Sequence, residues 1–267
     1  MIHLRIPAVI AVLAVLVPGV AKAAEIVVEI PSRGQLVRTL VDKPSGAPAA
    51  SLVLLAGGHG NLAIAKGGAI GWGAKNQVVR TRGDYVGAGF ITAVPDVAPD
   101  LKDGQSVKPA YRWSEPHAKD LGAVVKHLRS YGKPVYILGT SRAALSVANA
   151  AARLTGEEAP DAIVITSGMI AHIDDKHPSA QRNVGSLGRI KQPLLIVYHE
   201  KDGCAYTPAS SAEPARKLFS GARKVDVLIL KGGSAGGGDP CQASSHHGFL
   251  GMDSEVVKTI ATWLKAL

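Results

Sequence analysis

One serine lies where a strand pattern changes into a helix pattern. The apolar run PVYIL at 134–138 ends in GTSRA at 139–143, and small helix-forming residues follow at once. The small residues two positions before and two positions after Ser141 permit a tight strand-to-helix turn, on which larger side chains would clash. A serine exposed on such a turn can act as a nucleophile once a base removes its proton. An N-cap serine on an ordinary loop is the alternative interpretation.

Two further loops carry the residue types that would activate this serine. The GTSRA sequence resembles the nucleophile elbow G-x-S-x-G of the α/β-hydrolase superfamily, with alanine at the last position. The resemblance implies Asp202, after the apolar run 194–199, as the acid, with Glu200 in reserve. It implies His247, between the last strand and the last helix, as the base, with His246 in reserve. The order serine, aspartate, histidine is that of the superfamily. A solvated turn aspartate and a structural histidine pair are the alternatives.

Acyl transfer at a serine also needs two N–H donors aimed at the oxyanion that develops on the attacked carbonyl. The resemblance implies that one donor is the backbone N–H of Arg142, directly after the nucleophile. The other would come from the glycine-rich sequence GGHGN at 57–61, which resembles the H-G-G type loop of the superfamily with Ala56 where histidine often stands. Gly58 or His59 is the expected donor, and a plain tight turn is the alternative.

The two cysteines, Cys204 and Cys241, are expected to form a disulfide. In the superfamily topology the loop of the acid and the loop of the base lie side by side, so the bridge would join them. Two buried thiols are the alternative. Two cysteines are too few for a closed structural zinc site, and we expect no metal ion. Neither a P-loop nor a G-x-G-x-x-G sequence after the first strand is present, so we expect no cofactor.

Short β-rich runs alternate with helical patterns along the chain. Most of the runs are almost continuously apolar, which is typical of strands in a sheet covered on both faces. Helical spacing is clearest at 114–132, where Ser114 is a plausible N-cap, and at 254–267. The fold class predicted is α/β, a three-layer α/β/α sandwich with a mostly parallel sheet of about eight strands. The expected strands are 25–30, 35–41, 51–57, 89–96, 134–140, 161–168, 193–200 and 224–232.

The first residues resemble a secretory signal peptide. A basic start with Arg5, an apolar segment and the small-x-small sequence at 21–23 predict cleavage before Ala24. We therefore expect a signal peptide at 1–23, one α/β-hydrolase domain at 24–267, and a periplasmic or secreted protein without a stable membrane anchor. A retained anchor is the alternative. The net charge of +9 is scattered over the sequence without a basic run, so we do not expect nucleic-acid binding.

Together these features predict an exported serine hydrolase that cleaves small carboxylic esters through an acyl-enzyme. The resemblance is to small, cap-poor members such as the dienelactone-hydrolase-like group, although the nucleophile of that enzyme is cysteine. Peptidase, thioesterase and lactonase activities remain alternatives, because this fold hosts many reactions. A non-catalytic binding protein on the same fold is the alternative from a different functional class. The sequence does not indicate an oligomeric state.

Overall fold

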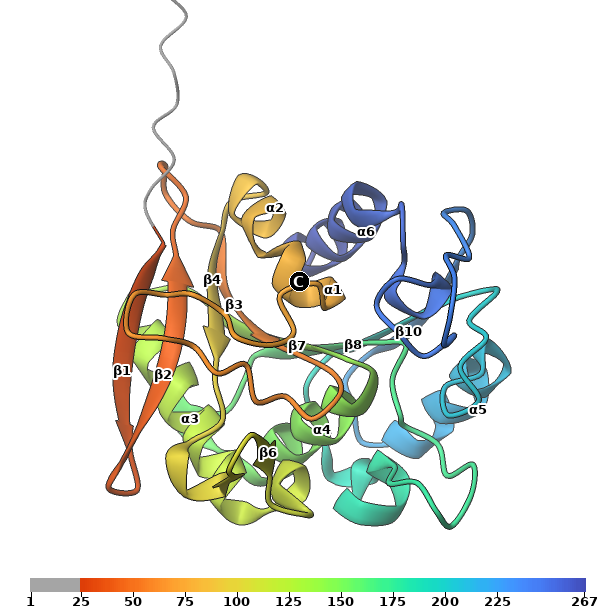
Figure 1. The fold of residues 1–267 in the computed structure, drawn as a ribbon, viewed down its shortest axis with the longest axis horizontal. Helices are drawn as coiled ribbons and strands as arrows, with labels where there is room; N and C mark the ends of the chain where they lie inside the picture. Colours follow the sequence, from red (N-terminus) through yellow and green to blue (C-terminus); the bar gives the residue numbers. More distant parts are fainter. Residues whose placement is uncertain (1–24) are drawn as a thin grey trace, which may run out of the picture.

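An eight-stranded, mostly parallel sheet organises the computed structural model, which describes residues 25–267 (Figure 1). The strand order is β1-β2-β4-β3-β7-β8-β9-β10, and only the β1–β2 and β2–β4 pairs are antiparallel. The strands are β1 (Ile26–Ser32), β2 (Gln35–Asp42), β3 (Ala50–Leu55), β4 (Phe90–Pro95), β7 (Val135–Thr140), β8 (Ala162–Thr166), β9 (Leu194–His199) and β10 (Val225–Leu230).

Helices cover both faces of the sheet, as expected for strands that are apolar on both sides. In Figure 1, α1, α2 and α6 lie above the sheet, and α3, α4 and α5 lie below it. The buried apolar side chains accordingly fall into two clusters, one on each face. The helices are α1 (Gln77–Arg80), α2 (Arg82–Gly87), α3 (Glu115–Arg129), α4 (Ala144–Arg153), α5 (Ala212–Arg216) and α6 (Asp253–Lys265).

All eight segments expected to be strands form strands, and the predicted fold class is confirmed. The Ser114 hydroxyl caps α3 by accepting a hydrogen bond from the backbone N–H of His117, so this prediction is also confirmed. Three short helices, α1, α2 and α5, and a small hairpin of β5 (Lys102–Asp103) and β6 (Ser106–Val107) were not expected. The predicted signal peptide lies outside the described residues. None of the helices within 25–267 combines the length and the apolar character needed to cross a membrane.

The topology places four loops together at the carboxyl end of the sheet. Strands β3, β7, β9 and β10 run parallel, so the segments that follow them meet at one edge. These segments are the glycine-rich loop after β3, the serine turn after β7, the aspartate loop after β9 and the histidine loop after β10. All the sequence-predicted site residues lie on them.

Candidate active site

The serine turn after β7 has the tight geometry that its small residues suggested. Ser141 has a φ of 55°, in the left-handed region that non-glycine residues seldom adopt. A Cβ on Gly139 would lie 2.6 Å from Val147 Cγ2 and 3.0 Å from Ala143 Cβ. Strand β7 and helix α4 therefore approach too closely for a side chain at position 139. The alanine at position 143 fits this space and points its single methyl group at that glycine. The strained turn leaves Ser141 half-buried at the pocket.

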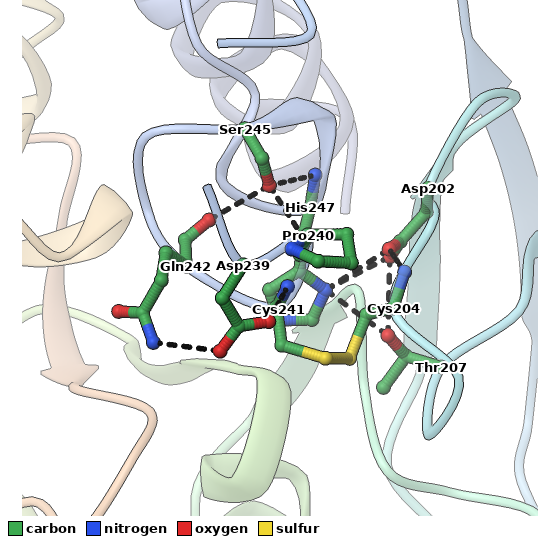
Figure 2. Close-up of a disulfide and its surroundings, with 9 residues drawn as sticks. All are labelled: Asp202, Cys204, Thr207, Asp239, Pro240, Cys241, Gln242, Ser245 and His247. Atoms are coloured by element: carbon green, nitrogen blue, oxygen red, sulfur yellow. Dashed lines mark hydrogen bonds and ion pairs between the residues drawn. A yellow bond between two sulfur atoms is a disulfide. The ribbon is translucent and has the colours of Figure 1, made fainter. Parts of the chain in front are cut away.

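An aspartate and a histidine from two distant loops form a buried pair. Asp202 Oδ2 lies 3.0 Å from His247 Nδ1, and the side chains are 0% and 4% exposed. Thr207 joins both residues, because its hydroxyl donates to Asp202 Oδ2 at 3.1 Å and lies 3.0 Å from His247 Nδ1. Figure 2 shows the three side chains converging. A carboxylate held against Nδ1 leaves Nε2 of the same ring as the nitrogen that can accept a proton.

The two reserve residues lie elsewhere. Glu200 forms an ion pair with Lys231 at 3.6 Å. His246 stacks on His199, with ring centroids 4.2 Å apart, whereas the histidine that hydrogen-bonds to Asp202 is His247. The structure therefore brings together the favoured acid and base rather than their alternatives.

The expected disulfide between Cys204 and Cys241 is present and joins the aspartate loop to the histidine loop. The backbone N–H of Cys204 also donates to Asp202 Oδ1 at 2.9 Å, so the carboxylate is held from the same segment. On the other side, Asp239 accepts a hydrogen bond from the backbone N–H of Cys241. This bond, followed by one from Gln242, lowers the pKa of Asp239 below its usual value. Figure 2 shows the disulfide beside the acid–base pair.

The glycine-rich loop after β3 packs directly against the serine turn. A Cβ on Gly57 would lie 3.0 Å from Ser141 Cβ, so the loop backbone touches the serine. A Cβ on Gly58 would lie 2.6 Å from the Trp72 ring, which also packs against the His59 ring with centroids 3.6 Å apart and planes tilted by 33°. Within residues 25–267, the backbone N–H groups of Gly58 and His59 meet no hydrogen-bond acceptor. These two amides are thus available to a ligand.

One open pocket of about 540 Å³ connects these groups. The pocket is lined by both disulfide cysteines and by five of the predicted site residues, Ser141, His247, Gly58, His59 and Arg142. The buried Nε2 of the histidine has no hydrogen-bond partner among the described residues, so no bond to the serine hydroxyl is formed. Catalytic hydrogen bonds often tighten only when substrate is present. No group of three or more histidine, cysteine, aspartate or glutamate residues that could hold a metal ion occurs in the described part of the chain.

Solved structures resemble this chain over most of its length. An esterase from Pyrococcus furiosus matches with a TM-score of 0.62 at 12% identity, covering 91% of this chain and 93% of the other. A dienelactone hydrolase from Anabaena variabilis matches with a TM-score of 0.59 at 16% identity, covering 91% and 97%. Est1E from Butyrivibrio proteoclasticus matches with a TM-score of 0.59 at 14% identity, covering 89% and 97%. The chain has the α/β-hydrolase fold. No protein-family model and no curated protein matches the sequence.

Three polar residues of this α/β-hydrolase fold were not anticipated from the sequence. Thr207 contacts the acid and the base, and Tyr111 and Arg112 contact the glycine-rich loop from behind. All three are at least 95% buried. No sequence signal distinguishes them, since threonine, tyrosine and arginine in loops are usually solvated or packed at the surface.

Proposed function

We propose that this protein is an exported serine hydrolase that cleaves carboxylic esters through an acyl-enzyme. The observation that carries the proposal is that one pocket is lined by Ser141, by His247 with Asp202 bonded to its ring, and by two residues with unpaired backbone N–H groups. The similarity to esterases and a dienelactone hydrolase supports it at the level of the fold.

The proposed reaction proceeds in two acyl transfers. Ser141 Oγ attacks the ester carbonyl while His247 Nε2 takes the hydroxyl proton, and Asp202 stabilises the resulting imidazolium. The backbone N–H groups of Gly58 and Arg142, with that of His59 beside them, bind the oxyanion. As the C–O bond breaks, Nε2 returns the proton to the leaving alcohol. Water then attacks the acyl-enzyme with the same histidine as base, which releases the acid and restores the serine.

Two features of the site favour small or extended esters. The pocket is open, and no large cap domain is inserted between the strands described above. Arg142 lines the pocket, and within the described residues it makes no ion pair with a carboxylate.

Export is proposed from the signal-like residues 1–23 and is compatible with the disulfide, because disulfides persist in oxidising compartments.

The test is the hydrolysis of a panel of p-nitrophenyl esters of increasing acyl length by the protein beginning at Ala24. We expect turnover of short esters that Ser141→Ala and His247→Ala each reduce by roughly 10³-fold or more. His246→Ala is the matched control and should keep most of the activity. Thioesters, a lactone and a peptide substrate in the same panel test the alternative activities. A folded protein that hydrolyses none of these would instead be a binding protein on this fold.

A further inference from the structure

A buried arginine lies directly behind the glycine-rich loop. Arg112 is 3% exposed, and its Nη2 donates to the carbonyls of Ala56, Gly57 and Gly58 at 2.8, 3.2 and 3.1 Å. The neighbouring Tyr111 hydroxyl donates to the carbonyl of His59 at 2.7 Å. Four consecutive carbonyls are therefore bound from one side by two adjacent side chains.

The contact of the loop with Tyr111 and Arg112 explains the glycine at position 60, which the contact with the serine turn does not explain. Gly60 has a φ of 80°, and a Cβ there would lie 2.4 Å from the Tyr111 hydroxyl and 2.5 Å from Arg112 Nη2. Any side chain at position 60 would push the loop off the guanidinium. The three glycines of the loop thus permit three close approaches: Gly57 to the serine turn, Gly58 to the Trp72 ring and Gly60 to the side chains of Tyr111 and Arg112.

The direction of these carbonyls determines the direction of the amide N–H groups. In a trans peptide the C=O of one residue and the N–H of the next point to opposite sides. Because the carbonyls of Gly57 and Gly58 point to Arg112, the N–H groups of Gly58 and His59 point away from it. Gly58 and His59 line the pocket together with Ser141, and their N–H groups have no acceptor within residues 25–267.

Arg112 also connects the loop to the helix that carries the serine turn. Its Nη1 donates to Ser146 Oγ at 2.9 Å, and Ser146 belongs to α4. His117 Nε2 lies 3.0 Å from the same hydroxyl. Burial, with the charge of Arg112 as a lesser cause, lowers the pKa of His117 to about 3 and keeps this histidine neutral. The guanidinium therefore bonds both to the glycine-rich loop and to the helix that follows Ser141. These are the two segments whose relative position the proposed oxyanion site depends on.

All hydrogen-bond partners of Arg112 in the described residues are neutral oxygens. Burial lowers the pKa of Arg112, but an arginine side chain stays protonated in proteins. A buried positive charge without a carboxylate polarises the peptide groups that it contacts. This polarisation strengthens their N–H groups as donors to an anion on the far side.

We propose that Arg112 is a positioning residue that aims the N–H groups of Gly58 and His59 at the oxyanion. The inference rests on the proposed function, since it assigns a role within the same acyl transfer. Arg112 does not touch the substrate and acts through the loop. Its removal should therefore weaken transition-state binding while leaving ground-state binding almost unchanged.

The experiment compares Arg112→Met and Arg112→Lys with the wild type on a short p-nitrophenyl ester. Loss of an oxyanion donor costs roughly 10²–10³-fold in kcat, so we expect Arg112→Met to lose about 100-fold in kcat with KM within about threefold. Arg112→Lys keeps the charge but reaches fewer carbonyls, and we expect a smaller loss. Arg129→Met is the matched control. Arg129 also donates to backbone carbonyls, those of Glu157 and Ala159, but it lies at the opposite end of the sheet.

A second measurement separates positioning from a merely structural role. An alkyl boronic acid forms a tetrahedral adduct with an active serine and so probes the oxyanion site. We expect its inhibition constant to rise about 100-fold in Arg112→Met, in step with the loss in kcat. Equal kcat in Arg112→Met and wild type, or a change in KM alone, would overturn the role of Arg112. A wild type that neither hydrolyses esters nor binds the boronate would overturn the proposed function itself.

If Arg112→Met does not fold, Tyr111→Phe provides the test. This change removes only the hydroxyl that donates to the His59 carbonyl and leaves the ring in place. The His59 carbonyl shares its peptide unit with the N–H of Gly60, so this change loosens the loop beside the His59 N–H without removing an Arg112 contact, and we expect a loss of up to about tenfold in kcat at constant KM. An unchanged kcat in Arg112→Lys as well as in Tyr111→Phe would contradict the proposal.

Discussion

Removing the disulfide is the perturbation whose effect follows most directly from the structure. Cys204 lies two residues after Asp202, and Cys241 lies six residues before His247. The segment between the last strand and His247 is rich in glycine, so little else in its sequence limits its conformations. The double variant Cys204→Ala/Cys241→Ala removes the cross-link and leaves the Asp202–His247–Thr207 contacts to hold the two loops.

The size of the effect can be worked from the length of the closed loop. The cysteines are 37 residues apart in sequence. The chain-entropy relation then gives about 4 kcal/mol at 25 °C for a cross-link of this length. The backbone N–H of Cys204 still donates to Asp202 in the variant, so the acid keeps one of its anchors. We therefore expect the free energy of unfolding to fall strongly and kcat to fall only modestly.

Urea unfolding followed by circular dichroism measures this difference on three samples: oxidised wild type, wild type with reductant, and the double variant. We expect the last two to unfold at lower urea, with a free energy of unfolding about 4 kcal/mol below the first. Reductant should not affect the double variant, which controls for side reactions. A difference under about 1 kcal/mol, with kcat also unchanged, would refute the reasoning that the bridge constrains the two loops.

Two further substitutions test the buried polar contacts. Thr207→Val keeps the shape but removes the hydroxyl between Asp202 and His247, so we expect kcat to fall about tenfold at constant KM in ester assays; a rise in KM alone would contradict this. The pKa of His117 is about 3 in the folded protein, against a usual histidine pKa of 6.5, so below pH 6.5 the unfolded chain binds a proton that the folded chain does not. The free energy of unfolding should therefore fall as pH drops, by about 2 kcal/mol at pH 5. Urea titrations of the wild type and of His117→Gln at pH 7.5 and pH 5 measure this loss. The free energy of unfolding should fall less in His117→Gln than in the wild type, and an equal fall in the two proteins would argue against a buried neutral histidine.

The sheet and the position of the site were readable in the sequence because each signal there is strong and local. Continuous apolar runs bounded by glycine or proline mark buried strands, and the helical spacing at 114–132 spans several turns. The small residues around Ser141 reflect a steric requirement that the Gly139–Val147 contact makes explicit. The disulfide followed from the superfamily topology that these elements implied.

The short helices and the supporting contacts could not be read in the same way. Helices α1, α2 and α5 have four to six residues, which is too short for an apolar period to be recognised. The burial of Arg112 depends on three carbonyls and the Ser146 hydroxyl brought to it by the tertiary fold, and nothing in the sequence YRW marks it as buried. Thr207 likewise gains its partners only when the aspartate and histidine loops meet. The glycines at 57, 58 and 60 were visible, but the serine turn, the Trp72 ring and the buried side chains that they approach were not.

Covalent labelling of Ser141 tests the central claim most directly. The oxidised protein would be treated with a serine-reactive phosphonate, and the mass of the intact protein and of its peptides would be measured. We expect one phosphonyl group per molecule on Ser141, no labelling of Ser141→Ala, strongly slowed labelling of His247→Ala and normal labelling of His246→Ala. A folded wild type that stays unlabelled, or that is labelled at another residue, would contradict a nucleophilic serine activated by His247.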